Sequence, residues 1–248
     1  MKSTIVATAL SVLLFQPVVH ALEIPPEPSC GANTKVHDVC STAILNLHPT
    51  QFSAGMIEIQ DRTEKIENMR QHKFTKFMKK HLVPVVIGPH RVFYMTDHHH
   101  LSLALYDAGL RTVNVQVTND WSNLSTDQFW SQMESAHQVY LYEDGNGPLP
   151  PSKLPANVLQ LHDDIYRSLA WAVQDQTGAF QKTSILFESF IWANFFRQHI
   201  PLSYVQSNFE GAVQQAAQLA QSPAAKGLPG YIGSETQQCT YFSPCHQG

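Results

Sequence analysis

The stretch VPVVIGPHRVFYMTDHHHLSLALYDAGLRTVNVQV, residues 83–117, decides the fold. It opens on a β-branched run, turns at a Gly-Pro pair, and changes from strand-like to helical spacing after Asp97. Gly109 is placed to end the helix. The pattern predicts a strand at 83–87, a turn at 88–90, a strand at 92–95, a helix at 97–108 and a strand at 113–117.

On either side of this unit the hydrophobic spacing predicts further elements. Before it we expect strands at 43–47 and 55–59 and one amphipathic helix over 62–82. After it we expect a helix at 126–136, a strand at 139–142, and helices at 165–176, 185–199 and 204–221.

The order of these elements predicts an α+β fold, with a mixed sheet first and helices later. A Gly- and Pro-rich loop over 143–155 is the best candidate boundary between the two parts. We therefore expect a signal peptide at 1–21, an extended N-terminal arm at 22–40, a sheet-containing domain at 41–145, a helical subdomain at 156–221 and an irregular tail at 222–248.

The first 21 residues read as a cleavable leader. Lys2 supplies a positive start, an apolar run follows, and Val19 and Ala21 are small residues at the −3 and −1 positions, so cleavage is expected before Leu22. The run is short and interrupted for a membrane span, which needs about 20 apolar residues. We expect an exported protein, periplasmic or secreted, without stable insertion in a membrane; an uncleaved anchor is the alternative.

The chain has four cysteines, two near each end. An even number in an exported protein indicates disulfides. We favour the local pairs Cys30–Cys40 and Cys239–Cys245, and pairing between the two ends is the alternative. No paired Cys or His spacing typical of a structural zinc site is present.

Charge and histidine content narrow the function. The net charge is −4, with 16 Lys and Arg against 20 Asp and Glu, so the chain lacks the overall basic character of a nucleic-acid-binding domain. The exception is the segment 62–82, with seven Lys and Arg against two Glu. It is either a solvated helix face or an anion-facing surface beside a site. The chain contains 13 histidines, the residue suited to acid–base chemistry near neutral pH.

The motif Asp97-His98-His99-His100 lies where a strand passes into a helix. Free backbone N–H groups and the helix dipole favour an anion at this point, and Asp97 suits the N-cap. Successive helical side chains diverge by about 100°, so three consecutive histidines cannot bind one metal ion together. We expect an anion at the N–H groups of His99 and His100, bound more tightly as pH falls through about 6.5. The alternative is a simple cap with histidines of mixed burial.

A second polar group begins the helix expected at 165–176. Asp164 reads as its N-cap, and Arg167 as either a partner for a buried carboxylate or a substrate-binding cation. Glu188 stands among aromatic residues four positions before Trp192, so we expect it to be partly buried and paired, with Arg167 the natural partner.

Residues 83–117 resemble the ParB/sulfiredoxin superfamily, in which a strand runs into such a turn and helix and the turn holds nucleotide phosphates. The chain as a whole is similar to an exported "putative ParB-like nuclease" family. The motifs that carry this similarity are LHPTQFSAGMIEI at 47–59, DHHH at 97–100, FWSQM at 129–133, DDIYRSLA at 163–170, FESFIWANFFR at 187–197 and LPGY at 228–231.

Two departures from the superfamily bear on chemistry. Sulfiredoxin-type activity needs a cysteine in the turn, where this chain has histidines, and ParB proteins carry Gly after the Asp and usually Arg after the histidines, where this chain has His98 and Leu101. The resemblance further implies a catalytic carboxylate near Glu58, as in related kinases; a solvent-facing Glu on an edge strand is the alternative.

From these residues and the resemblance we expect an exported hydrolase or phosphoryl-transfer enzyme. Its substrate would contain phosphate, as a nucleotide or nucleic acid. The candidate catalytic residues are His98, His99, His100, Asp97 and Glu58, and the candidate substrate-binding residues are Arg62, Lys65 and Arg167. A divalent metal as cofactor stays open, and the rival is a non-catalytic binding module or secreted effector on the same fold.

Overall fold

The computed structural model describes residues 22–233 and contains a five-stranded mixed sheet with helices around it. The strands lie in the order β1 (Val39–Ala43), β6 (Thr112–Asp120), β4 (Val83–Ile87), β5 (Phe93–Met95) and β2 (Leu47–Pro49). β4 runs parallel to β6 and antiparallel to β5, β5 runs parallel to β2, and β1 is antiparallel to β6. A separate parallel pair joins β3 (Ser53–Ala54) to β7 (His162–Asp163). The α+β fold class is confirmed.

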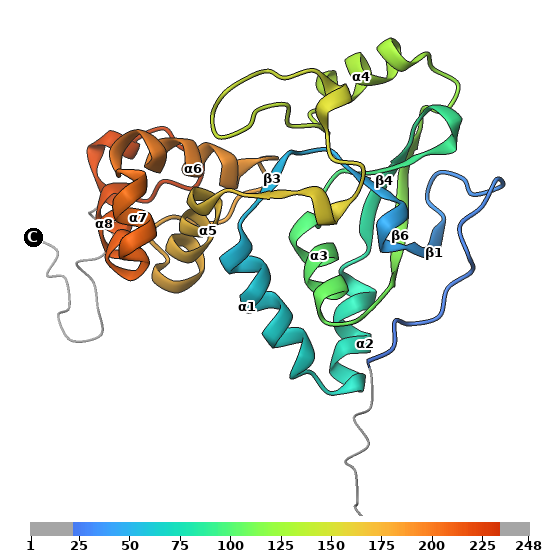
Figure 1. Ribbon diagram of the computed structural model, residues 1–248, viewed down its shortest axis with the longest axis horizontal. Coiled ribbons are helices and arrows are strands. Elements are labelled where there is room, and N and C mark those ends of the chain that lie inside the picture. Colours follow the sequence, from blue (N-terminus) through green and yellow to red (C-terminus); the bar gives the residue numbers. More distant parts are fainter. Residues whose placement is uncertain (1–21, 234–248) are drawn as a thin grey trace, which may run out of the picture.

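Eight α-helices accompany the strands within residues 22–233. They are α1 (Met56–Glu67), α2 (Gln71–Lys80), α3 (His99–Asp107), α4 (Thr126–Ser135), α5 (Ile165–Ala172), α6 (Glu188–His199), α7 (Leu202–Ser207) and α8 (Phe209–Gln221). Figure 1 shows α5 to α8 gathered at one end of the molecule, the sheet at the other, and α1 and α3 between them. No helix in this part of the chain is long and apolar enough to cross a membrane.

The segment 83–117 folds as its sequence predicts: β4, a short turn, β5, α3 and β6 follow one another. β4 is almost wholly buried in the middle of the sheet, as its β-branched run requires. Gly109 has φ +89°, the left-handed conformation that ends a helix at little cost in glycine. One detail differs, because His98 rather than Asp97 directly precedes α3, and His98 has φ +63°.

The strand predicted at 55–59 is wrong: these residues enter α1. Three groups distant in sequence cap its start. The N–H of Gly55 donates to His100 Nε2 at 2.9 Å, that of Met56 to Asp163 Oδ1 at 3.0 Å, and that of Ile57 to Ser168 Oγ at 3.1 Å. No side chain of the flanking sequence caps the helix. Tertiary contacts therefore stabilise a helix here, although the alternating apolar and polar residues favour a strand.

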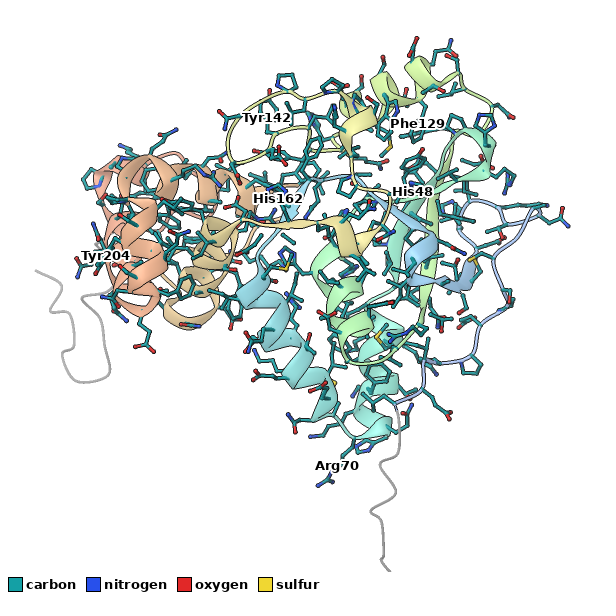
Figure 2. The ribbon with its side chains drawn as sticks, in the orientation of Figure 1. His48, Arg70, Phe129, Tyr142, His162 and Tyr204 are labelled. Atoms are coloured by element: carbon teal, nitrogen blue, oxygen red, sulfur yellow. A yellow bond between two sulfur atoms is a disulfide. The ribbon has the colours of Figure 1, made fainter. Side chains whose placement is uncertain are left out.

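Other boundaries also differ. The strand expected at 43–47 is interrupted by a turn at Ile44–Asn46, which carries the chain from β1 to β2 at the opposite edge of the sheet. The helix expected over 62–82 is two helices, broken beside Arg70, whose side chain points away from the molecule in Figure 2. Residues 139–142 form no strand, although the N–H of Tyr140 donates to Thr50 O at 2.9 Å.

The C-terminal helices follow the predictions with shifted ends. α5 continues into a π-helical turn at Val173–Thr177, and α6 begins three residues later than expected. The helix expected at 204–221 is divided at Asn208, whose side chain accepts from the N–H of Gly211 at 3.1 Å and caps α8. A side chain that competes for backbone hydrogen bonds in this way favours a helix end over a helix interior.

The N-terminal arm lies against the sheet. Its Cys30 is disulfide-bonded to Cys40, as predicted, and Ser41 N donates to Pro28 O at 2.8 Å. Cys239 and Cys245 lie outside the described residues. Buried apolar side chains form three clusters: between the sheet and α1–α3, between the sheet and α4, and among α5–α8. The division into domains predicted from the sequence stays a prediction.

Candidate functional site

A cleft of about 430 Å³ opens where α1, α3, α5 and the segment 180–190 meet. Seven of the eight residues to which the sequence assigned catalysis or substrate binding line it: Glu58, Arg62, Asp97, His98, His99, His100 and Arg167. Lys65 does not. It pairs with Asp61 at 2.6 Å, one turn further along α1, with its Nζ 5.9 Å from the centre of the Trp171 ring.

His99 and His100 are held as hydrogen-bond acceptors. His99 Nε2 accepts from the N–H of Thr50 at 3.1 Å, and His100 Nε2 accepts from the N–H of Gly55 at 2.9 Å. Burial lowers the pKa of His99 to about 3 and that of His100 well below 6.5. Both rings are therefore neutral at physiological pH, and they position the loop after β2 and the start of α1.

The neutral state of His100 determines the nature of its contact with Glu58. His100 Nε2 lies 3.4 Å from Glu58 Oε2, a distance that suits an ion pair only if the imidazole is charged. The lone pair of Nε2 is already used to accept from Gly55, and burial and the nearby Arg167 and Arg62 oppose protonation. We therefore take the neutral ring as the stable form and the Glu58 contact as simple proximity.

Glu58 is buried on α1, so the alternative of a solvent-facing Glu on an edge strand is wrong. Its Oε1 accepts from Arg62 Nε at 2.8 Å and lies 2.8 Å from Arg62 Nη2, so the two side chains form a forked pair one helical turn apart. Oε2 stays free to meet a ligand in the cleft.

His98 differs from its two neighbours. Its Nδ1 is buried without a hydrogen-bond partner in residues 22–233. Burial lowers the pKa of His98, partly offset by the charge of Asp97. The left-handed backbone at φ +63° turns this side chain toward His81, whose ring centre is 6.0 Å away. A neutral imidazole with an unused lone pair can accept a proton.

Asp97 is exposed at the mouth of the cleft, and its Oδ1 accepts from the N–H of His98 at 2.6 Å. It therefore uses one backbone N–H at the start of α3. No partner is assigned, within the described chain, to the N–H groups of His99 and His100. These two groups, at the positive end of the helix dipole, are available to an anion.

Arg167 is the most unusual residue of the cleft. It is 4% exposed, its guanidinium lies 3.4 Å from the centre of the Phe190 ring, and its Nε and Nη1 have no hydrogen-bond partner in residues 22–233. Burial lowers its pKa from 12.5 to about 10, although Glu58 and Asp164 raise it. A desolvated guanidinium with unused donors is a strong anion-binding group.

Glu188, the partner proposed for Arg167 from the sequence, does not pair with it. Asp164 caps α5 as predicted, accepting from the N–H of Tyr166 at 3.0 Å, and its carboxylate pairs with Arg197 at 2.6 Å. Glu188 is buried and accepts from Gln174 Nε2 at 2.9 Å and from Thr183 Oγ1 at 2.6 Å. Neither carboxylate needs Arg167.

Several residues that line the cleft were not predicted from the sequence. Trp171 and Gln174 follow Arg167 on the helix, and residues 182–190 form the opposite wall, with Ile185 and Leu186 about half exposed. Two such apolar residues followed by Phe187 at φ +59° are an unusual loop, but nothing in their spacing points to a site. Between residues 22 and 233, no group of three or more His, Cys, Asp or Glu is arranged to hold a metal ion.

Comparison with known proteins places this arrangement in a family. Residues 40–198 match the family described as "Putative ParB-like nuclease". The crystal structure of protein Atu1540 from Agrobacterium tumefaciens is 34% identical, with a TM-score of 0.73, over 79% of this chain and 97% of that one. No curated protein matches the chain.

A second solved structure is far more distant. The C-terminally truncated chromosome-partitioning protein ParB from Caulobacter crescentus, in complex with CTP-γ-S, is 14% identical with a TM-score of 0.26, over 77% of this chain and 94% of that one. No inference about this cleft follows from an overlap of that kind. The family match covers most of the sheet, the motif at α3 and the two helices that carry Arg167 and Glu188. The chain belongs to the "Putative ParB-like nuclease" family.

Proposed function

We propose that the cleft is the active site of an exported enzyme that hydrolyses, or transfers, a phosphoryl group of a phosphate-containing substrate. The observation that carries the proposal is Arg167, a buried guanidinium with unused hydrogen-bond donors beside the free N–H groups that begin α3. A buried cation whose hydrogen-bond donors are unused lowers stability, so its presence in a cleft is best explained by a negatively charged ligand.

The charges lining the cleft bear on the size of that ligand. Three cationic side chains, Arg62, Arg167 and Lys182, face three acidic ones, Glu58, Asp97 and Glu188. Arg62 is neutralised by Glu58, and Glu188 is occupied by Thr183 and Gln174. Arg167 and the exposed Lys182 are thus left without an ion-pair partner among the described residues, and two cations opposed by Asp97 suit a single phosphate monoester or diester better than a polyphosphate. The Arg167 guanidinium would bind two phosphate oxygens, and the N–H groups of His99 and His100 a third.

Proton transfer would fall to His98 or Glu58. His98 is the stronger candidate for the base, because its lowered pKa keeps the ring neutral at pH 7 and Nδ1 has no partner. Glu58 keeps one carboxylate oxygen free, and its pair with Arg62 holds it in place. His99 and His100 would serve as positioning residues. Phosphoryl chemistry depends mainly on such positioning and on charge stabilisation.

A binding module without catalysis is the second candidate, and one observation favours it. Two of the three histidines of the motif are committed to backbone N–H groups and are neutral, so they cannot supply a proton. If His98 and Glu58 are equally structural, the cleft would hold a phosphate group and leave it intact.

Export remains part of the proposal. Residues 1–21 lie outside the described part of the chain, and the leader is inferred from their sequence. The Cys30–Cys40 disulfide supports an oxidising destination, because such bonds are rare in the cytosol. Expression with the full leader, followed by fractionation and N-terminal sequencing, tests it. Cleavage before Leu22 is expected, and full-length protein kept in the cytosol contradicts export.

The activity is tested by measuring binding and turnover separately. Inorganic phosphate should raise the melting temperature of the wild type, since a ligand that binds only the folded state stabilises it. p-Nitrophenyl phosphate, bis-p-nitrophenyl phosphate, and DNA and RNA oligonucleotides should be tried with Mg²⁺, Mn²⁺ or Zn²⁺, and with EDTA. We expect turnover of at least one ester, lost by a factor of about 100 or more in His98→Ala or Glu58→Gln.

Arg167→Met should abolish the shift caused by phosphate. Arg111→Met is the matched control, since Arg111 also covers an aromatic ring, that of Tyr106 at 4.1 Å, but lies outside the cleft. Phosphate binding without turnover of any ester would favour the binding module. No phosphate binding at all, or equal binding by Arg167→Met, would contradict both functions.

A further inference from the structure

A second pocket lies on the other side of the β2–β5 edge and shares no lining residue with the cleft. Its volume is about 410 Å³, within the ordinary range for small-molecule sites. β2 and β5 contribute one wall, the start of α4 a second, and the proline-rich segment 151–155 a third. In Figure 1 the segment 151–155 lies beside α4, away from α5 to α8.

The aromatic wall of the pocket is fixed by packing. The Tyr94 ring lies between His48, at 5.4 Å between ring centres, and Phe129, at 4.8 Å; both are labelled in Figure 2. Trp130 meets Tyr94 nearly at a right angle, at 5.3 Å. A Cβ at Gly88 would come within 2.6 Å of the Tyr94 ring, so glycine there permits this placement. The rings therefore form a preformed surface.

The polar groups of the same residues are unused. Within residues 22–233, no hydrogen bond or ion pair is formed by the Tyr94 hydroxyl, the Trp130 indole N–H, the His48 ring nitrogens or the Asp127 carboxylate, although all four residues line the pocket. The hydroxyls of Thr126 and Ser152 stand beside them. Asp127 is exposed and His48, Tyr94 and Trp130 are partly exposed, so these four polar groups are accessible to a ligand in the pocket.

The chemistry of these groups selects the ligand. No lysine or arginine lines the pocket, and burial lowers the pKa of His48, so the ring is neutral and an anion finds no counter-charge. A quaternary ammonium ion would suit Asp127 and the rings but would leave the donors of Tyr94 and Trp130 unpaired. A sugar hydroxyl both donates and accepts, and the apolar C–H face of a pyranose packs on an aromatic ring.

We propose that this pocket is a binding site for a neutral carbohydrate. Asp127 accepts from two sugar hydroxyls, Tyr94 and Trp130 donate to others, and the aromatic rings contact the C–H face. This site is independent of the phosphate chemistry proposed for the cleft. An exported protein that meets polysaccharide could use it to hold itself near a substrate, but the binding itself requires no catalysis.

The test is a titration of the full chain with glucose, galactose, mannose, N-acetylglucosamine and their β-1,4-linked disaccharides. Binding is monitored by saturation-transfer NMR and by the chemical shifts of the indole N–H signals of the four tryptophans. The Trp130 signal, assigned with Trp130→Phe, should move with at least one sugar at millimolar concentration or below. Asp127→Ala should weaken that binding about tenfold, and Tyr94→Phe, which keeps the ring, about threefold.

Asp175→Ala is the matched control, because Asp175 is exposed and lines neither pocket. It should bind the sugar as the wild type does, and phosphate should leave the Trp130 signal unchanged. The proposal fails if no sugar moves that signal in the tens of millimolar range, or if Asp127→Ala and Tyr94→Phe both bind as the wild type. A Trp130 signal that responds to tetramethylammonium and to none of the sugars would equally overturn it.

Discussion

Arg167 shows how a single residue can be placed for a ligand at the expense of stability. Its neighbours Glu58 and Asp164 are satisfied by Arg62 and Arg197, so no carboxylate depends on it. The fall of its pKa from 12.5 to about 10 corresponds to roughly 3 kcal/mol against the charged form in the folded protein. The folded pKa is depressed, so this penalty is present at neutral pH and disappears only above about pH 12.

Arg167→Met should therefore stabilise the protein. Methionine keeps the packing on Phe190 and removes a buried charge, and such replacements gain about 1–3 kcal/mol when no partner is orphaned. In a chain of this size, that corresponds to a rise in melting temperature of about 2–10 °C by calorimetry at pH 7 without phosphate. A lower melting temperature would show that Arg167 is a structural ion-pair partner. Arg111→Met, an exposed counterpart, should change little.

His99 and His100 make stability depend on pH. Their pKa values in the folded protein lie far below 6.5, about 3 for His99, so the unfolded chain binds more protons between these limits and stability falls as pH falls. Between pH 7.5 and 5, His99 alone should cost about 2 kcal/mol in urea unfolding. Because both rings stay neutral in the folded protein near pH 6.5, they cannot produce the increase in anion binding that the sequence predicted as the pH falls.

His99→Gln tests this, because glutamine places a carbonyl oxygen near the position of Nε2 and does not titrate. The variant should lose about 2 kcal/mol of the pH dependence and keep the hydrogen bond to Thr50. His72→Gln removes an exposed histidine and should follow the wild-type profile. An unchanged pH dependence in His99→Gln would mean that His99 is not the group that titrates.

At the level of single residues, the sequence predicted much of the candidate site. The Asp97–His100 motif was found because the change from strand-like to helical spacing can be recognised in the sequence. Arg167 was found because it is a charged residue on an apolar helix. Lys65 was misplaced, since it shares a face of α1 with Glu58 and Arg62 but lies beyond the end of the cleft. The extent of a cleft depends on the elements that pack around it, and the spacing of residues along one helix does not reveal those neighbours.

Among the elements, α1 shows why some helices are missed. The N–H groups of Gly55, Met56 and Ile57, at its start, donate to His100, Asp163 and Ser168, which come from α3, β7 and α5. A helix start is recognised in sequence by a local cap, and this one has none. The elements with local signals, such as α4 with its capping box at Ser125, were predicted to within a residue.

Gly55 is the position at which this arrangement is most sensitive. A Cβ there would lie 2.6 Å from the backbone nitrogen of Ser168, so α1 and α5 could not approach as closely. Gly55→Ala should cost about 1–3 kcal/mol in urea unfolding, because a backbone contact cannot yield as a side chain does. It should also weaken phosphate binding, since α1 carries Glu58 and Arg62.

Gly31→Ala is the control for that prediction. Its Cβ would meet no atom within 4 Å, and its backbone does not require glycine. The substitution should be neutral or slightly stabilising, by restricting the unfolded chain. Equal effects of the two substitutions would mean that the α1–α5 approach is not tight.

For the molecule as a whole, the predicted fold class is confirmed, while the assembly of the cleft could not be foreseen. Its walls come from residues 58–62, 96–101, 167–174 and 180–190, so its formation depends on contacts between segments as distant in the chain as α1 and the loop before α6. The segment 180–190 was the hardest to assign, because its polar anchor, Glu188 with Thr183 and Gln174, becomes visible only when the chain is folded.

The pairing of the N-terminal arm with β1 has a consequence for the behaviour of the protein in solution. β1 is an outermost strand of the sheet, and the arm occupies its open side: Ser41 N donates to Pro28 O at 2.8 Å, Cys30 N to Ser41 O at 2.9 Å, and the disulfide to Cys40 holds the arm there. An outermost strand with unpaired N–H and C=O groups is a template for pairing with other molecules.

We therefore predict that the disulfide hinders self-association by keeping the arm on β1. Cys30→Ser/Cys40→Ser should release the arm and increase the fraction of large species in size-exclusion chromatography with light scattering. Cys239→Ser/Cys245→Ser, which leaves this disulfide intact, should match the wild type. An unchanged distribution in Cys30→Ser/Cys40→Ser would show that hydrogen bonds alone keep the strand covered. If the disulfide keeps β1 covered in this way, oxidation of Cys30 and Cys40 protects this protein from aggregation as well as stabilising the fold.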